Sequence, residues 1–330
     1  MSIIIEQYKN TVATLPMQKT WTDAPLYKYE GFWYHQGFWF QSEYASFSLE
    51  AVMASQDDFH AQPTDVFLAT YPKSGTTWLK ALAFAITNRT KFSYGPTHPL
   101  ATTCPHDCVP YIESEAYINN PSYANGLLAT HIPYTSLPKS IISSGSRIVY
   151  ICRDPKDVFI SFWHFKKKYI DDSSTDPIML EKAFECFSKG VFEFGSSWDH
   201  VIGYRKASLE WPDKILFLNY EEMKRDAKNE VKKLANFIGH PFTEEEEAKG
   251  EVEEIIKLCS FDKLSKASKD RDATPNVISN DIFFRKGVVG DSVNHLTDEM
   301  IQILDKITTE KYEGLDIPIY NNDKFVVFEK

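Results

Sequence analysis

Cysteine is scarce in this chain, and long hydrophobic runs are missing. The 330 residues include five cysteines, an odd number, and none of the runs of about 18 apolar residues that a membrane-spanning helix needs. So few cysteines argue against the disulfide framework of a secreted domain. The first thirty residues carry charges throughout and contain no apolar segment, so we expect no signal peptide. These absences predict a cytoplasmic protein with no membrane partner.

Positive charge is also in short supply. The formal net charge is −10, from 36 lysines and arginines against 46 aspartates and glutamates. Nucleic acids and anionic membranes select basic surfaces, so neither is expected as the main partner. The chain has no Gly-Lys dipeptide, which excludes the usual nucleotide loop G-x-x-x-x-G-K-[ST]. An anionic ligand would therefore need a local concentration of lysines and arginines.

A different phosphate loop is predicted after the apolar run Val66–Thr70. That run reads as a strand, and the segment Tyr71-Pro72-Lys73-Ser74-Gly75-Thr76-Thr77-Trp78 leads from it into a helical pattern. The unpaired N–H groups and the dipole at a helix start favour a bound anion. Lys73 adds a full charge, and the neighbouring serine and threonines add hydroxyl donors.

Further apolar strands are predicted at residues 126–130, 147–152 and 214–220, with helical patterns between them. Such alternation is typical of an α/β fold, a parallel sheet covered by helices on both faces. Ligands of these sheets bind beyond the carboxyl ends of the strands. Because Lys73, His131, Arg153 and Tyr220 lie at or just past strand ends, we expect them to converge. No repeat or linker divides the chain, so residues 1–330 are predicted to form a single domain.

Two segments lack a clear period. Residues 1–60 are rich in aromatics, most densely at 31–40, and either pack on the core or line an apolar acceptor pocket. Residues 92–125 contain several prolines and read as a long irregular loop on the substrate side. Within that loop His98, Cys104, His106 and Cys108 cluster, which raises the alternative of a zinc site, although the spacing fits no standard zinc finger.

The segment Lys73–Trp78 resembles the 5′-phosphosulfate loop of the cytosolic sulfotransferases, which use 3′-phosphoadenosine 5′-phosphosulfate (PAPS). The resemblance extends to 153–157 with Ser161, to 285–287 with Gly290 and Asp291, and to 129–131. Motifs at 31–34, 163–165 and 198–204 are similar to those of the plant branch. The resemblance implies a sulfotransferase fold, related to that of the P-loop nucleoside triphosphate hydrolases.

The resemblance also implies roles. His131 would be the general base, and Lys73 would stabilise the leaving phosphate as the sulfuryl group is transferred. The remaining residues would bind the cofactor: Ser74, Gly75, Thr76 and Thr77 its 5′-phosphosulfate; Arg153, Ser161, Arg285, Lys286 and Gly287 its 3′-phosphate; Trp78, Tyr220, Cys259, Ser260 and Phe261 the region of its adenine. No metal is expected.

Two departures from the family pattern concern the C-terminal part. The cofactor signature usually continues Gly-Asp-Trp-Lys, whereas Ser292 and Val293 follow Asp291 here. Whether this segment closes over the 3′-phosphate therefore does not follow from the signature. The short dimer motif of animal members is not matched around Val293, Thr297 and Asp298. No dimer is carried over, and the oligomeric state stays open.

The predicted function is transfer of the sulfuryl group from PAPS to a hydroxyl of a small, largely apolar acceptor such as a flavonoid, a steroid (brassinosteroids included) or a hydroxylated hormone. Two alternatives stay open. One is a binding protein that kept the pocket but closes poorly over the cofactor. The other is a P-loop small-molecule kinase, which the absent Gly-Lys-[Ser/Thr] disfavours and which would depend on Mg²⁺.

Overall fold

The computed structural model describes residues 7–22, 24–35, 47–121, 126–170, 177–269, 280–321 and 324–326. Its centre is a four-stranded parallel sheet in the order β5-β4-β6-β7. The strands are β4 (Val66–Thr70), β5 (Leu127–Thr130), β6 (Arg147–Cys152) and β7 (Ile215–Asn219). The predicted parallel sheet and its strand positions are confirmed, with boundaries within one residue of those expected.

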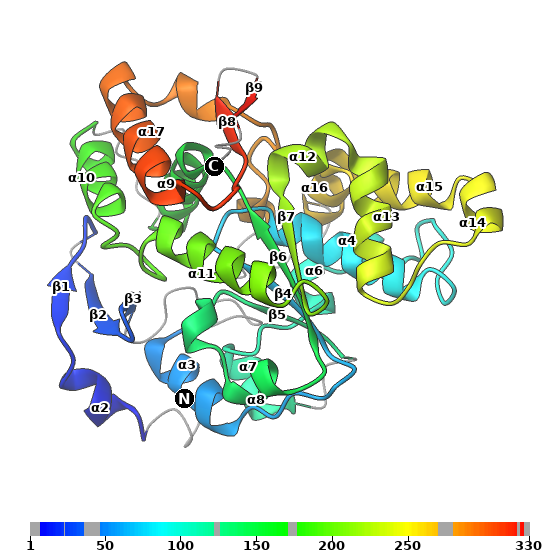
Figure 1. Ribbon diagram of the computed structural model, residues 1–330, viewed down its shortest axis with the longest axis horizontal. Helices are drawn as coiled ribbons and strands as arrows, with labels where there is room; N and C mark the ends of the chain where they lie inside the picture. Colours follow the sequence, from blue (N-terminus) through cyan, green and yellow to red (C-terminus); the bar gives the residue numbers. More distant parts are fainter. Residues whose placement is uncertain are drawn as a thin grey trace.

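Helices cover the sheet on both faces, which explains why its strands are almost wholly buried. In Figure 1 one group of helices, coloured cyan to yellow, lies to the right of the sheet, and another, coloured green and orange, lies to its left. The first group includes α4 (Thr76–Asn88), α12 (Tyr220–Arg225), α13 (Ala227–Phe237), α15 (Glu251–Leu258) and α16 (Phe261–Lys269). The second includes α9 (Pro155–Ile170), α10 (Pro177–Ser188), α11 (Ser197–Glu210) and α17 (Asp298–Tyr312).

Local sequence signals set several helix ends. Asp154 accepts a hydrogen bond from the Lys156 N–H at 2.8 Å, and Pro155 occupies the first position of α9. Thr243 and Glu246 form the expected capping box at α14 (Glu244–Ala248). The acidic run 244–247 therefore lies in the first turn of a helix, where the dipole favours negative charge.

The first sixty residues contain elements that the sequence did not reveal. The strands β1 (Met17–Lys19), β2 (Pro25–Tyr29) and β3 (Phe32–His35) form a small antiparallel sheet. It lies at the edge of the molecule in Figure 1, near the helices α2 (Lys9–Ala13) and α3 (Leu49–Asp58). The part of the aromatic stretch at 36–40 lies outside the described residues.

The expectation of an irregular segment at 92–125 was wrong in part. The segment contains the short helices α5 (Pro99–Thr102), α6 (Pro105–Cys108) and α7 (Glu115–Asn119), while residues 122–125 lie outside the described residues. Pro99 and Pro105 occupy the first positions of α5 and α6, where the missing N–H costs nothing. Two of the prolines that suggested a loop, Pro99 and Pro105, are therefore helix starts.

The remaining described elements are short. They are α8 (Lys139–Ser143), β8 (Ile319–Asn321), β9 (Lys324–Val326) and the 3₁₀ helices η2 (Tyr134–Ser136), η3 (Asn280–Phe283) and η4 (Asp291–Asn294). Within the described residues, no helix combines the length and the apolar character that crossing a membrane requires.

Candidate active site

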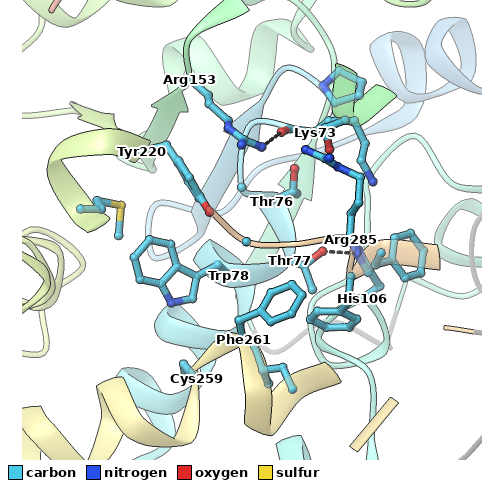
Figure 2. Close-up of a pocket in the computed structure, with 18 of the residues that line it drawn as sticks. Lys73, Thr76, Thr77, Trp78, His106, Arg153, Tyr220, Cys259, Phe261 and Arg285 are labelled. Carbon is cyan, nitrogen blue, oxygen red and sulfur yellow. Dashed lines mark hydrogen bonds between the residues drawn. The ribbon is translucent and has the colours of Figure 1, made fainter. Parts of the chain in front are cut away.

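A cavity of about 360 Å³ opens at the carboxyl edge of the parallel sheet. Each central strand leads to it, because Lys73 follows β4, His131 follows β5, Arg153 follows β6 and Tyr220 follows β7. The expected convergence of these residues is confirmed. Of the predicted site residues all but Ser74 line the cavity: Lys73, Gly75, Thr76, Thr77, Trp78, His131, Arg153, Ser161, Tyr220, Cys259, Ser260, Phe261, Arg285, Lys286 and Gly287. Figure 2 shows how several of them point into one space.

The loop between β4 and α4 has an unusual backbone. Lys73 has a φ of 69°, in the left-handed region that residues with a Cβ atom rarely adopt. Gly75 has a φ of 107°, and a Cβ atom there would lie 2.7 Å from Cδ2 of Tyr220. Ser74 is buried beneath the turn, where its N–H donates to the Tyr71 carbonyl at 3.2 Å. The loop thus brings the N-terminus of α4 to the cavity wall.

The Lys73 ammonium lies 4.2 Å from the centre of the Phe165 ring. Burial, together with the charges of Arg153 and Arg285, lowers the pKa of Lys73 to about 7. An anion beside these three cations would favour their charged forms. The site is therefore electrostatically suited to a phosphate or a sulfate.

Two arginines face the same part of the cavity. Arg153 donates to the Asp157 carboxylate and to the Val288 carbonyl, each at 3.0 Å, while Arg285 and Lys286 pair with the Asp291 carboxylate. The Nε atoms of both arginines are buried, and neither has a hydrogen-bond partner among the described residues. Both arginines line the cavity and each keeps one N–H group without a protein partner, which suits an additional phosphate group, since buried N–H groups are otherwise paired.

Aromatic rings form the adjoining wall. Trp78 and Tyr220 lie edge to face with their ring centres 5.7 Å apart, and the Arg153 guanidinium lies over the Tyr220 ring at 4.6 Å. Figure 2 places Cys259 and Phe261 on the neighbouring yellow helices. A Cβ atom at Gly287 would collide with the Phe261 ring, so only glycine lets these two segments meet. The wall has the flat apolar surfaces that a purine base requires.

His131 lies at the end of β5 with a fixed orientation. Its Nδ1 lies 2.8 Å from the Thr70 carbonyl oxygen, which can only accept, so Nδ1 carries the hydrogen and Nε2 keeps a free electron pair. Its backbone N–H donates to Glu113 at 2.6 Å, and its carbonyl accepts from His200 at 3.0 Å. Burial lowers the pKa of His131 to about 3, so the ring is neutral near pH 7. The ring can therefore accept a proton at Nε2.

Three aromatic rings surround the His131 imidazole. The ring centres of Tyr111, Phe194 and Phe47 lie 4.9, 5.4 and 5.9 Å from that of His131. The space next to the predicted base is thus apolar, as an aromatic or alicyclic acceptor would require.

Several cavity residues were not identified from the sequence. They are Phe47, Pro72, His106, Asp107, Tyr111, Phe165, Met223, Lys224, Ala227, Ile256, Leu264, Phe283 and Phe284. Most are apolar and reach the cavity through tertiary packing, which no local pattern announces. The sequence singled out His106 only as a possible zinc ligand. A signal for its actual place was Lys80, which falls on the buried face of α4, because a buried lysine needs polar partners.

The two histidines of 98–108 have different partners. His98 accepts from the Leu100 N–H at 3.1 Å as the cap of α5 and packs among aromatic rings, whereas His106 bonds to Thr77. In the part of the chain that the structure describes, no three His, Cys, Asp or Glu side chains are grouped to hold a metal ion.

Although Ser292 and Val293 differ from the family pattern, the segment around them is held to Asp157 through its backbone N–H groups. The N–H groups of Gly290 and Ser292 donate to the two carboxylate oxygens of Asp157, at 2.8 and 3.0 Å. Ser292 is buried, and the Val293 side chain is 59% exposed. The attachment depends on Asp157 rather than on the side chains that differ from the family pattern.

Comparisons with known proteins agree with this geometry. Residues 63–316 match the family described as Sulfotransferase domain. Flavonol 3-sulfotransferase of Flaveria bidentis is 48% identical over 87% of this chain and 90% of its own length. Cytosolic sulfotransferase 17 of Arabidopsis thaliana is 44% identical over 94% of this chain and 89% of its own length. The structure of an Arabidopsis thaliana putative steroid sulphotransferase is 35% identical, with a TM-score of 0.73 over 96% of this chain and 97% of that one. The chain therefore belongs to the sulfotransferase family, as a PAPS-dependent enzyme of its plant cytosolic branch.

Proposed function

We propose that this enzyme transfers the sulfuryl group of PAPS to a hydroxyl of a small, largely apolar acceptor, with a flavonol or a steroid as the classes to test first. The main support is the cavity itself. Its cations, Arg153 and Arg285 among them, its aromatic wall and His131 all line one space of about 360 Å³. The relatives named for flavonols, and the solved structure named as a putative steroid sulphotransferase, point to these acceptor classes.

The residues present fit a nucleotide with phosphates at both ends of its ribose. The α4 N-terminus with Lys73, Thr76 and Thr77 would hold the 5′-phosphosulfate, and Arg153, Ser161, Arg285, Lys286 and Gly287 the 3′-phosphate. Trp78, Tyr220 and Phe261, with Cys259 and Ser260 beside them, would enclose the adenine. The structure of a mouse sulfotransferase complexed with PAP, 28% identical with a TM-score of 0.63, supports this assignment.

His131 would take the proton of the acceptor hydroxyl at Nε2 as the oxygen attacks sulfur. The new bond joins the acceptor oxygen to sulfur, and the bond that breaks joins sulfur to the bridging oxygen of the 5′-phosphate. Lys73 would stabilise the charge that develops on that leaving phosphate, which the low polarity of the site makes effective. Because the side chains supply both the base and the cations, we propose that no metal is needed.

Residues 92–125 would form the substrate side of this single-domain enzyme. They contribute Tyr111 beside His131 and His106 beside Thr77, both on the cavity wall. We propose a small-molecule acceptor as the partner of this face, with neither nucleic acid nor a membrane involved.

The two alternative functions make different demands. A P-loop kinase would bind ADP with Mg²⁺ and gain nothing from a 3′-phosphate. A binding protein that closes poorly would bind the nucleotide without transferring sulfate. The Asp157 attachment of the C-terminal segment argues against poor closure.

The first test is calorimetric titration with 3′-phosphoadenosine 5′-phosphate (PAP) in EDTA, repeated with ADP. We expect PAP to bind at least 10-fold more tightly than ADP, since the 3′-phosphate meets two arginines in charge-assisted hydrogen bonds worth about 1.5–3 kcal/mol each. A transfer assay with PAPS then compares a flavonol with a hydroxysteroid. Equal affinity for the two nucleotides would refute the cofactor assignment.

The variant His131→Ala separates binding from chemistry in the same assays. We expect its affinity for PAP to change little and its turnover to fall about 10²-fold to 10⁴-fold, the range for loss of a general base. Unchanged turnover would remove His131 from the mechanism.

A further inference from the structure

His106 connects the phosphate loop to a buried lysine. Its Nε2 lies 3.0 Å from Oγ1 of Thr77, in the first turn of α4. Its Nδ1 lies 3.3 Å from Nζ of Lys80 and 3.2 Å from the hydroxyl oxygen of Tyr111. Figure 2 shows His106 and Thr77 joined by a hydrogen bond at the cavity wall.

Two donors face Nδ1 and thereby select one tautomer of His106. Lys80 donates to the Val109 carbonyl at 2.8 Å. Burial lowers the pKa of Lys80 well below its ordinary value, and the amine keeps further N–H groups for Nδ1 whether it is charged or neutral. Burial raises the pKa of Tyr111 well above its ordinary value, so the phenol keeps its hydrogen. We infer that Nδ1 accepts from these two groups, which places the hydrogen of the imidazole on Nε2. Burial also lowers the pKa of His106 well below its ordinary value, which keeps the ring neutral.

This tautomer fixes the Thr77 hydroxyl. Because Nε2–H donates to it, the Thr77 oxygen accepts at that point, and its own hydrogen must point elsewhere. The neighbouring Thr76 hydroxyl differs, since it bonds to the buried Thr70 hydroxyl at 2.7 Å. Thr77 lines the cavity at the start of α4, where an anion is favoured.

We propose that His106 is a positioning residue for the cofactor: held by Lys80 and Tyr111, it orients the Thr77 hydroxyl so that its hydrogen meets the 5′ end of the bound nucleotide. The inference rests on the proposed function, and adds a residue outside the segments that carry the family resemblance. It also assigns a role to Lys80, which would hold the His106 ring in place. This fully buried lysine sits on the apolar face of α4, where a methionine or leucine would avoid the cost of burying an amine.

The test compares two nucleotides and a small set of variants. PAP carries a 5′-phosphate and adenosine 3′-phosphate does not, so only PAP reports on the Thr77 contact. Calorimetric titrations use the wild type, His106→Leu, His106→Gln, Thr77→Val and the double variant His106→Leu with Thr77→Val. Glutamine can donate to Thr77 through its amide nitrogen and accept from Lys80 through its oxygen, so it is the conservative replacement. Thermal unfolding confirms that each variant is folded.

We expect His106→Leu to weaken PAP binding about 5-fold to 30-fold, which is less than the loss of a whole hydrogen bond to a charged group because the Thr77 hydroxyl remains. Binding of adenosine 3′-phosphate should stay within about 2-fold. His106→Gln should recover most of the loss. In the Thr77→Val background, His106→Leu should add little, because its effect passes through Thr77.

Two results would overturn the inference. One is an equal loss for both nucleotides, and the other is an equal loss with and without the Thr77 hydroxyl, since either would assign His106 to packing alone. A failure of the proposed function looks different. It would appear in the wild type as equal affinity for PAP and ADP, and it would remove the basis of this inference as well.

Discussion

Lys73 carries two costs that a bound anion would offset. Its backbone has a φ of 69°, and strain of this kind in a non-glycine residue costs about 1–3 kcal/mol. Its ammonium is also crowded by Arg153 and Arg285 and removed from water. An unligated site of this kind favours loss of the lysine's proton, and an arriving phosphate favours its return.

We therefore expect cofactor binding to take up a proton. In the free site the pKa of Lys73 is about 7, so at pH 8 most of the side chain is neutral. An adjacent phosphate raises that pKa, and binding at pH 8 then adds close to one proton per site. Near pH 6 the lysine is already charged, and the uptake should fade. Titration of PAP in buffers with different ionisation enthalpies measures the number of protons bound.

Matched lysine variants test the assignment. Lys73→Met should lose the uptake at pH 8, whereas replacement of the exposed Lys139 by methionine should retain it. An uptake that is the same in Lys73→Met, or that does not vary between pH 6 and pH 8, would contradict it.

At the scale of elements, the sequence located the strands because a parallel sheet buried on both faces needs nearly continuous apolar runs. β4 and β6 match the predicted ranges, and the cations beyond their ends, Lys73 and Arg153, line the cavity. Helix starts with a side-chain cap, such as Thr243 before α14, could be predicted from the sequence equally well. These features depend on residues close in sequence.

What escaped prediction depends on contacts between distant segments. The four-residue helices α5 and α6 are too short to show a period, and their prolines resembled loop residues. The bond between His106 and Thr77 joins α6 to α4, so neither sequence segment alone contains it. The left-handed φ of Lys73 likewise cannot be predicted from the sequence, because lysine has no preference for that region.

Asp157, in the first turn of α9, holds the C-terminal cofactor segment at Gly290 and Ser292. A variant of Asp157 can test this attachment. Its carboxylate accepts from Arg153, from Gly290 N–H and from Ser292 N–H. In Asp157→Asn the amide can accept at only one atom, and the buried donors lose a charged partner. We expect PAP affinity to fall about 10-fold to 100-fold, since hydrogen bonds to charged groups are worth about 1.5–3 kcal/mol. Titration with PAP measures the change.

The control for Asp157 is Val293→Lys, which restores the usual family residue at an exposed position. Since the Val293 side chain does not line the cavity, PAP affinity should stay within about 2-fold. A large gain in this variant, together with no loss in Asp157→Asn, would show that closure depends on the missing side chains instead.

Across the whole molecule, the acidic chain and its cationic cavity are compatible because the cations are gathered by tertiary structure. Lys73, Arg153, Arg285 and Lys286 come from three separated segments and meet at the sheet edge. Folding therefore concentrates positive charge in a chain whose formal net charge is −10. It also buries several histidines in neutral form around the same edge.

These histidines should make the fold sensitive to acid. Burial lowers the pKa of His131 to about 3 and the pKa values of His200 and His164 to about 4, from the ordinary 6.5. Below pH 6.5 the unfolded chain binds protons that the native histidines do not, so stability is lost as the pH falls. Burial raises the pKa values of Glu113 and Glu221 to about 7 and opposes this trend between about pH 7 and pH 4.5. The histidines outnumber these glutamates, and His106 acts in the same direction as the histidines.

We therefore predict that the midpoint of urea unfolding decreases from pH 7 to pH 5, and decreases more steeply below about pH 4.5, where the opposing glutamate contribution fades. His131→Gln, whose amide does not titrate, should flatten the pH dependence. His60→Gln, at an exposed histidine, should leave the slope of the wild type unchanged. If the slope is the same in His131→Gln as in the wild type, the neutral burial of His131 is not a source of the acid sensitivity. A midpoint that does not change with pH would contradict the neutral burial of the whole set.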